Sequence, residues 1–314
     1  MKQKVYFVVG PTASGKTAAA VELALRLGGE VVSADSMAIY RGMDIGTAKP
    51  SPKEMCGITH HMLSCVDPAQ PYSVSEYKED ALHCIEDILS RNKVPIVCGG
   101  TGLYVNALIY PLDFSSVRSN GAIRAKWEAY AAEHGNEALH EQLRRVDKAS
   151  ANAIHPNNVR RVIRALEIYE CTGVAKSAQA SLNHPKELPY EPIMMGITME
   201  RPALYARCDQ RVEEMLRRGL CNEVDGLLRS GLSAEAQSMQ GIGYKELAAA
   251  LLGRISMEKA VELIRSNTRH LAKRQLTWFR ANDKIRWFDA SDPHERAKVC
   301  ERMTVYSLGN LGKS

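Results

Sequence analysis

Short runs of consecutive apolar residues alternate with helix-like segments along the first hundred positions. Residues 5–9 and 94–98 are apolar runs bounded by turn or polar residues, which is typical of parallel strands buried on both faces. Residues 30–35 resemble a further strand that ends in a polar tip. Residues 18–27 are predicted to form a helix that ends at Gly28. The pattern indicates an α/β protein.

A second helix is predicted to begin near Ser73. The segment Ser73-Val74-Ser75-Glu76 fits a capping box, and apolar residues then recur with helical spacing at Tyr77, Ala81, Ile85 and Ile88. Strands and helices therefore alternate, which is the order found in a doubly wound parallel sheet.

The pattern changes beyond about residue 115. Residues 122–173 are almost entirely helical in character, residues 174–190 are polar like a linker, and residues 192–198 could return to the sheet as a strand. A long helix is predicted from about residue 257 to 281. We therefore expect a P-loop core interrupted by a helical insertion domain, with the core in residues 1–115 and 190–314 and the insertion in residues 116–189.

Composition changes this picture little. The 314 residues are 45% hydrophobic and 25% charged, as in ordinary globular proteins, and the net charge of +5 is too small to prove a nucleic-acid partner. The eight cysteines have no metal-site or disulfide spacing. No apolar stretch approaches the ~20 residues of a membrane span, so we expect a cytoplasmic protein without a membrane partner.

The turn after the first predicted strand carries candidate chemistry. Residues 10–17 match the pattern G-x-x-x-x-G-K-[ST], in which backbone N–H groups and a helix N-terminus converge on phosphate oxygens. Lys16 adds a positive charge, and the hydroxyl of Thr17 can hold a magnesium ion. A chance match in a glycine-containing turn is disfavoured, because a strand precedes the motif and a helix follows it. The predicted binding residues are Gly10, Pro11, Thr12, Ala13, Ser14, Gly15, Lys16 and Thr17.

A carboxylate that usually assists magnesium in NTPases is missing from its expected place. The third predicted strand runs into Gly99-Gly100-Thr101 without an acid, whereas Asp35 follows the second strand. Asp35 could be a turn or capping residue. At the carboxyl end of a strand beside the phosphate loop, it is also well placed for chemistry.

Positive charge is concentrated in two segments. One comprises Arg160, Arg161 and Arg164, and the other spans residues 265–286 with Arg265, Arg269, Lys273, Arg274, Arg280, Lys284 and Arg286. Each could be a solvated helix face, but together they favour a polyanion such as RNA. The pair His60-His61 lacks partners at metal-ligand spacing and is interpreted as structural.

Several motifs together resemble the tRNA dimethylallyltransferases, also called tRNA isopentenyltransferases. The matching segments, in the family's order, are the P-loop at 10–17, Ser-Ala-Asp-Ser at 33–36, residues 40–50, His60-His61, residues 99–104, residues 155–161, residues 164–167 and Gly-Tyr-Lys-Glu at 243–246. The resemblance extends from residue 5 to about residue 285, and the 33–50 block is far more specific than the P-loop.

The resemblance implies transfer of a dimethylallyl group from dimethylallyl diphosphate to the exocyclic amine of the adenosine 3′ to the anticodon of tRNA. It implies Mg²⁺ as cofactor, the P-loop as the binding site of the donor's diphosphate, and the tRNA anticodon stem-loop as partner; we expect a monomer. By the same resemblance, Asp35 would be the general base, Thr101 a channel residue, and Arg211 a residue facing the diphosphate. The implied tRNA contacts are Asp35, Ser36, Met37, Ala38, Thr101, Arg124, Val159, Arg160, Arg161, Val162 and Ile163.

One departure and two other functions stay open. Family members commonly carry Gln where this chain has Ala38, which puts one hydrogen bond to the adenosine in doubt. A P-loop small-molecule kinase with an Arg-bearing lid would account for Lys16 and the first Arg cluster, but not for the missing magnesium acid. A non-catalytic, nucleotide-gated RNA-binding protein would leave Asp35 without a role.

Overall fold

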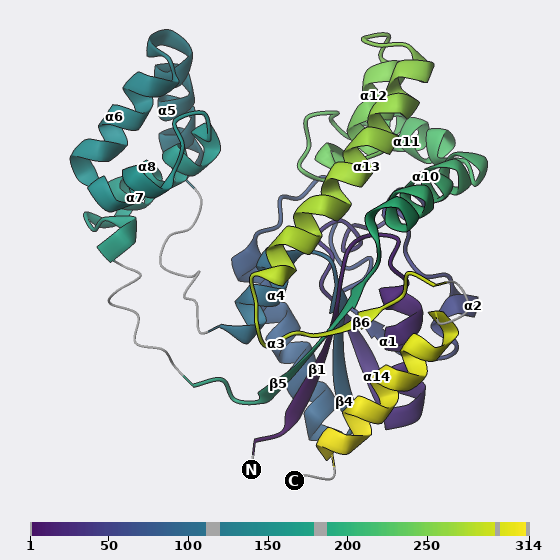
Figure 1. The fold of residues 1–314 in the computed structure, drawn as a ribbon. Helices are drawn as coiled ribbons and strands as arrows, with labels where there is room; N and C mark the ends of the chain where they lie inside the picture. Colours follow the sequence, from purple (N-terminus) through teal and green to yellow (C-terminus); the bar gives the residue numbers. More distant parts are fainter. Residues whose placement is uncertain (1, 111–119, 179–186, 293–295, 312–314) are drawn as a thin grey trace. The chain divides into compact units, whose positions relative to one another are not determined.

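The chain divides into two compact units. The computed structural model describes residues 2–110, 120–178, 187–292 and 296–311. We call Met1–Ile109 together with Leu188–Ser314 the core unit, and Tyr110–Glu187 the helical unit. Figure 1 shows both along the chain. The expected limit at 115/116 lies outside the described residues, and the expected limit at 189/190 stays a prediction.

A single parallel sheet forms the centre of the core unit. Its described strands are β1 (Lys4–Val9), β2 (Gly29–Ser33), β3 (His60–His61), β4 (Val94–Gly99), β5 (Glu191–Thr198) and β6 (Arg286–Asp289). Their order is β3-β2-β4-β1-β5-β6, and every neighbouring pair is parallel (Figure 1). The predicted α/β class and the four predicted strands are confirmed. The short edge strands β3 and β6 were not predicted.

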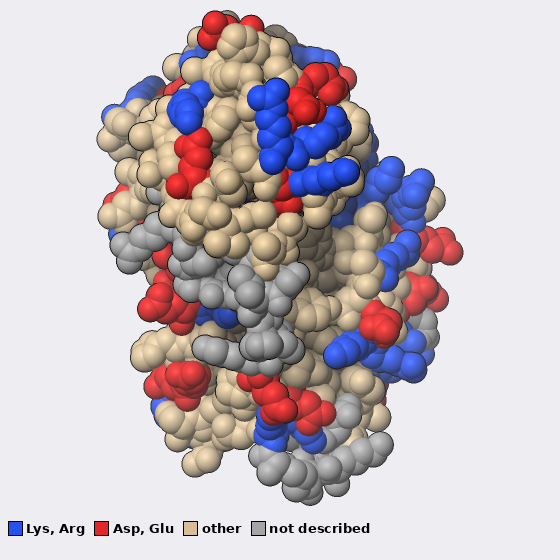
Figure 2. Space-filling model, turned by 90° about the vertical axis from the view of Figure 1, so that its left-hand side faces the viewer, with Lys and Arg blue, Asp and Glu red and all other residues tan. Residues whose placement is uncertain are grey.

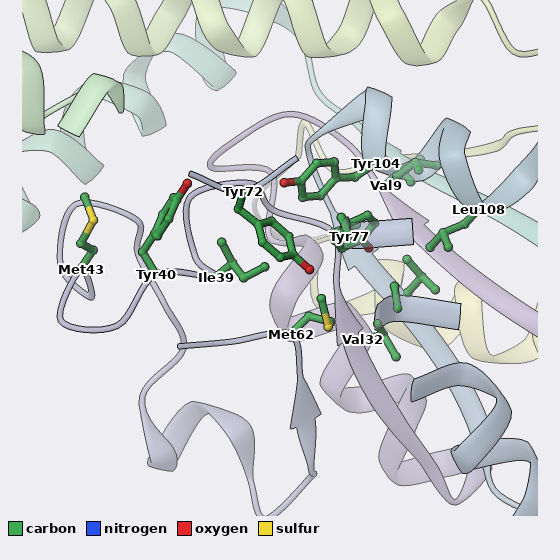
Figure 3. Close-up of a cluster of buried hydrophobic side chains, with 14 of the residues drawn as sticks. Val9, Val32, Ile39, Tyr40, Met43, Met62, Tyr72, Tyr77, Tyr104 and Leu108 are labelled. Atoms are coloured by element: carbon green, nitrogen blue, oxygen red, sulfur yellow. The ribbon is translucent and has the colours of Figure 1, made fainter. Parts of the chain in front are cut away.

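Both faces of the sheet are buried, as continuous apolar strands require. In β1, Tyr6 and Val8 pack into one hydrophobic cluster, which includes residues of α1 (Lys16–Leu27) and α14 (Arg296–Leu311). Phe7 and Val9 face the other cluster, which includes residues of α3 (Val74–Ser90) and α4 (Gly102–Ile109). Figure 3 shows part of that second cluster.

Two tyrosines connect α3 and α4 in this cluster. The rings of Tyr77 and Tyr104 are stacked with centroids 3.8 Å apart, and the hydroxyl of Tyr77 donates to the carbonyl oxygen of Ser33 at 3.0 Å (Figure 3). Ser33 is the last residue of β2. The aromatic pair therefore supports the end of β2, directly before Asp35.

Local sequence signals set the helix ends. Ser73 and Glu76 form the predicted capping box of α3, and Gly28 adopts φ +63° at the C-terminus of α1. Pro202 lies in the first turn of α10. The remaining helices of the core unit are α2 (Pro52–Met55), α10 (Arg201–Arg217), α11 (Leu220–Arg229), the 3₁₀ helix η1 (Ser238–Gln240), α12 (Tyr244–Leu251) and α13 (Met257–Arg280).

The helical unit has its own hydrophobic core. It contains α5 (Gly121–His134), α6 (Asn136–Val146), α7 (Lys148–Ala153) and α8 (Val159–Thr172), which confirms the predicted helical character of residues 122–173. Leu139, Leu143, Val162 and Leu166 are buried together. The buried carboxylate of Asp147 accepts hydrogen bonds from the N–H groups of Ser150 and Ser177 and from the hydroxyl of Ser177.

The state of the cysteines and the hydropathy of the helices are two further features of the described chain. All eight cysteines are free thiols, in keeping with their irregular spacing. Among the described helices, none combines the length and the hydropathy that crossing a bilayer requires.

Candidate functional site

The P-loop connects the central strand β1 to helix α1. Gly10 has φ +152°, and a Cβ at this position would lie 2.7 Å from the carbonyl oxygen of Ile197 in β5, so the close approach of β5 excludes a side chain. Gly15 adopts φ +93° and begins α1. Lys16 and Thr17 therefore occupy the first turn of the helix, where unpaired N–H groups favour an anion.

Positive charge surrounds this loop. The Lys16 ammonium donates to the carbonyl oxygen of Pro11 at 3.3 Å, and desolvation by burial lowers its pKa. Burial likewise lowers the pKa of Arg211 on α10, while the charge of Asp35 opposes both shifts. Arg207 on the same helix donates from Nε to the carbonyl oxygen of Ala13 at 2.7 Å. The buried cations Lys16 and Arg211, together with Arg207 at the loop, therefore favour the binding of an anion.

Asp35 and Thr101 come together at the ends of adjacent strands. Asp35 follows β2, and its Oδ1 accepts hydrogen bonds from the N–H groups of Met37 (2.9 Å) and Ala38 (3.3 Å). Thr101 follows β4, and its Oγ1 accepts from the N–H of Ser36 at 3.0 Å. Among the described residues no group donates to Oδ2 of Asp35, so this oxygen can receive a proton from a bound molecule.

A cleft in the core unit brings together six of the predicted residues, Thr12 among them. Lys16, Thr17, Asp35, Ala38 and Arg211 all line it. Thr101 does not line it, but it accepts a hydrogen bond from the N–H of Ser36, the chain neighbour of Asp35. Further lining residues are Ala20, Val31, Ser33, Thr47, Ala48, Lys49, Pro50, His60, Leu63, Cys98, Gly99, Leu271 and Gln275. Phosphate-binding groups and a carboxylate thus share one cleft.

Buried charge holds the wall formed by residues 47–50. The Lys49 side chain is 7% exposed, and its ammonium donates to the carbonyl oxygen of Tyr40, to Asp44 Oδ1 (2.7 Å) and to Ser64 Oγ (2.7 Å). This satisfies all three donors of the ammonium group. Lys49 therefore ties both ends of the 40–49 loop to the neighbouring segment at Ser64.

A carboxylate holds the same loop from outside. Glu223 on α11 accepts hydrogen bonds from the N–H groups of Asp44 (2.9 Å), Ile45 (2.8 Å) and Gly46 (3.2 Å), and from the hydroxyl of Tyr244 at 2.6 Å. Three successive amides form an anion-binding nest, which the protein fills with its own side chain. We call Glu223 and Tyr244 the loop clamp.

The other predicted tRNA contacts lie in the helical unit. Arg160 and Arg161 are exposed, whereas the side chains of Val162 and Ile163 are buried in that unit's core. A contact from residues 159–163 would therefore come from the two arginines and the partly exposed Val159. Arg124 pairs with both oxygens of Glu167, the buried acid that also pairs with Arg164.

The basic segment 265–286 is less uniform than its sequence indicates. Arg265 pairs with Glu213 at 3.2 Å and Arg269 with Asp209 at 2.9 Å, so both connect α13 to α10. Lys273 and Arg274 are exposed. For the chain as a whole, basic and acidic side chains are mixed on the face that Figure 2 draws.

The residues present fit a magnesium ion that is held mainly by substrate. No group of three or more His, Cys, Asp or Glu suited to a metal occurs among the described residues. Thr17 and Asp35 are oxygen donors in the cleft. Mg²⁺ commonly keeps waters and uses one or two protein oxygens together with phosphate oxygens. His61 pairs with the buried Glu30 at 2.7 Å, in keeping with its structural interpretation.

Sequence reasoning missed several residues of the cleft. His60 lines it: Nδ1 lies 2.9 Å from the carbonyl oxygen of Ile58, and the buried Nε2 contacts no polar partner within the described part of the chain. Lys49 and Gln275 were missed because nothing in their local spacing marks them. For Lys49 the available signal was its place in the 40–50 block that resembles the family.

Comparisons with known proteins agree with this geometry. The family model described as IPP transferase matches residues 38–282, and that described as Isopentenyl transferase matches residues 3–66. A protein of Geobacillus thermodenitrificans named tRNA dimethylallyltransferase is 49% identical over 99% of this chain and 98% of its own length. One of Halalkalibacterium halodurans with the same name is 45% identical over 96% of each chain.

Solved structures show the same relationship. The tRNA isopentenylpyrophosphate transferase of Bacillus halodurans superposes with a TM-score of 0.74 at 42% identity, covering 99% of this chain and 98% of that one. A eukaryotic dimethylallyltransferase acting on tRNA gives a TM-score of 0.81 at 30% identity, covering 96% of this chain and 78% of that one. With its phosphate loop and carboxylate in one cleft, the chain belongs to the IPP transferase family and is a tRNA prenyltransferase.

Proposed function

We propose that the chain transfers a dimethylallyl group from dimethylallyl diphosphate to the exocyclic amine of the adenosine 3′ to the anticodon. The observation that carries this proposal is the shared cleft of Lys16, Arg211 and Asp35. One end of the cleft suits a diphosphate, and the carboxylate suits an amine that must lose a proton. The relatives named tRNA dimethylallyltransferase support the choice of substrates.

Residues of the P-loop and α10 would bind the donor. The amides of residues 13–17 and the N-terminus of α1 would hold the diphosphate, and Lys16 and Arg211 would stabilise the negative charge that grows as the diphosphate leaves. Thr17 would hold Mg²⁺, which supplies further charge neutralisation when bound. The allylic carbon becomes electrophilic as its bond to the diphosphate oxygen breaks.

Asp35 would act as general base at the acceptor. As the adenine nitrogen forms its bond to the allylic carbon, Oδ2 of Asp35 would take the amine proton. Oδ1 would keep its hydrogen bonds from the N–H groups of Met37 and Ala38. Thr101 and Ser36 would contact the base beside Asp35. The target base must leave the anticodon stack to reach the cleft. Ala38 offers no polar side-chain group to that base.

The helical unit would bind the tRNA backbone. Arg160 and Arg161 are exposed and suited to phosphates, with Val159 beside them, while Val162 and Ile163 would place their helix. Arg124 would add a contact from its partly exposed guanidinium. We further propose that the enzyme works in the cytoplasm, where its tRNA substrate is processed, and as a monomer.

One incubation tests the proposal. Unmodified tRNA is mixed with dimethylallyl diphosphate labelled in the allyl group, or with ATP labelled in the γ-phosphate, and the tRNA is digested to nucleosides. We expect allyl label on the adenosine 3′ to the anticodon and diphosphate as the second product, with little transfer by Lys16→Ala. Transfer of γ-phosphate to a small molecule instead would establish a kinase.

A further inference from the structure

A glutamine on α13 connects the two halves of the cleft. Oε1 of Gln275 accepts a hydrogen bond from the P-loop N–H of Thr12 at 2.7 Å. Nε2 of the same amide donates to the carbonyl oxygen of Gly100 at 3.0 Å. One neighbour is a donor and the other an acceptor, so only this orientation of the amide satisfies both. A single side chain thus spans the P-loop and the segment that follows β4.

The hydrogen bond from Gln275 to Gly100 leads to the residues next to Asp35, where the acceptor base would bind. Gly100 precedes Thr101, whose Oγ1 accepts from the N–H of Ser36, next to Asp35. The N–H of Thr101 donates to the carbonyl oxygen of Ala34 at 3.1 Å, which fixes the same turn from the other side. Two hydrogen bonds of Gln275, the peptide bond from Gly100 to Thr101 and the hydrogen bonds of Thr101 therefore connect the P-loop to the residues around the carboxylate.

Close packing makes this connection stiff. A Cβ on Gly100 would collide with the Gln275 amide nitrogen, and a Cβ on Gly102 would collide with the ring of Trp278, one turn further along α13. The helix therefore lies directly on the backbone of residues 100–102. A shift of the P-loop relative to that backbone would break at least one of the two hydrogen bonds of Gln275.

We infer that Gln275 is a positioning residue that keeps the donor's leaving group and the acceptor carboxylate in register. The inference rests on the proposed function and adds a role that contacts neither reacting atom. Transfer requires the reacting carbon and nitrogen to lie about 3–3.5 Å apart and in line, so a small misplacement lowers the rate without lowering affinity for either substrate. The effect should therefore appear in kcat rather than in binding.

Two variants separate the two hydrogen bonds. Gln275→Met keeps a similar length but loses both. Gln275→Glu keeps the acceptor for Thr12 N–H, but the ionised carboxylate cannot donate to Gly100 O; when protonated, its O–H can. Gln240→Met is the matched control, since this exposed amide also donates to a backbone carbonyl, that of Ala234, outside the cleft.

The measurements are single-turnover rates and the dissociation constants of donor and tRNA. For Gln275→Met we expect a rate about 10- to 100-fold below that of Gln240→Met, with both dissociation constants within about threefold. For Gln275→Glu the rate divided by that of Gln275→Met should rise as the pH is lowered toward 5. The charged and titratable groups that line the same cleft are present in both variants, so the ratio removes their contribution; they are Lys16, Asp35, Lys49, His60, Cys98 and Arg211.

Three results would overturn the inference. These are a Gln275→Met rate within threefold of the control, a rate loss that is matched by weaker donor binding, or a pH-independent ratio. If Gln275→Met does not fold, the comparison of Gln275→Glu with the wild type across the same pH range replaces it. Failure of the proposed function would appear differently, as absence of transfer by the wild-type chain itself.

Discussion

The loop clamp allows a stability prediction to be worked from the structure. Glu223 accepts four hydrogen bonds, of which the one from Asp44 N–H is exposed and can be replaced by water. The bonds from Ile45 N–H, Gly46 N–H and Tyr244 O–H are partly buried. At about 1 kcal/mol for each partly buried bond, Glu223→Ala should lower the free energy of unfolding by about 3 kcal/mol.

Glu223→Gln should cost less, because one amide oxygen can still accept two of the four bonds. Its NH₂ group would then face either the N–H groups of Asp44 and Ile45, or the N–H of Gly46 and the hydroxyl of Tyr244, so about half of the stabilisation is lost. Asp225→Asn is the control on the same helix, because the one ion pair of Asp225 within the described ranges is the solvent-exposed pair with Arg229. We expect a change of less than about 0.5 kcal/mol there.

Thermal and urea unfolding of the three variants provide the assay. In a chain of this size, 1 kcal/mol corresponds to about 2–4 °C, so the midpoint of Glu223→Ala should fall by roughly 6–12 °C. Saturating dimethylallyl diphosphate should recover part of this loss, because residues 47–50 line the cleft. If Glu223→Ala and Asp225→Asn have the same unfolding midpoint, the loop clamp contributes no stability and the reasoning is refuted.

The remaining predictions concern three sites. Asp35→Asn should lower the single-turnover rate by about 10²–10⁴ while donor and tRNA dissociation constants stay within about tenfold; rescue by excess magnesium would instead make Asp35 a metal ligand. Arg160→Glu with Arg161→Glu should weaken tRNA binding and flatten its dependence on salt, with donor binding unchanged; an unaltered salt series would mark a solvated helix face. Burial raises the pKa of Asp147, but hydrogen bonds from two serines outweigh it and lower the pKa to about 2. The ionised form therefore adds about 2 kcal/mol above pH ~4, which is lost as the pH falls toward 2, and acid unfolding of Asp147→Asn should lack that loss.

The sequence was sufficient for the parts of the fold that are specified locally. The apolar runs of β1 and β4 are long and buried on both faces, and the capping box before α3 lies within four residues, so each could be recognised without a partner. By contrast, β3 has two residues and β6 four, and both are edge strands with exposed or half-exposed positions. Only pairing with β2 and β5 makes them strands.

The candidate site was predictable in its chemistry but not in its supports. The P-loop and Asp35 were found because glycine spacing and strand ends carry a local signal. Gln275 binds the backbone of Thr12, 263 residues away, and Glu223 binds the backbone of residues 44–46, 177 to 179 residues away. Because every residue type except proline carries a backbone N–H, the sequence gives no sign of such contacts. The pairing of Arg124 with the buried Glu167 could not be predicted because the two residues are 43 positions apart. This pairing reduces the unpaired positive charge that the sequence led us to expect in the helical unit.

The central position of β1 has a consequence for synthesis on the ribosome. β1 pairs with β4 on one side and with β5 on the other, and β5 begins at Glu191. Between the end of β4 at Gly99 and the start of β5 at Glu191 the ribosome adds roughly 90 residues, which takes about 5–20 s at ~5–20 residues per second. For that time the nascent chain carries β1 with one unpaired edge, while the helical unit can already bury its own core. Such an edge invites pairing with other nascent chains, so the interval before β5 emerges is when this enzyme most needs a chaperone.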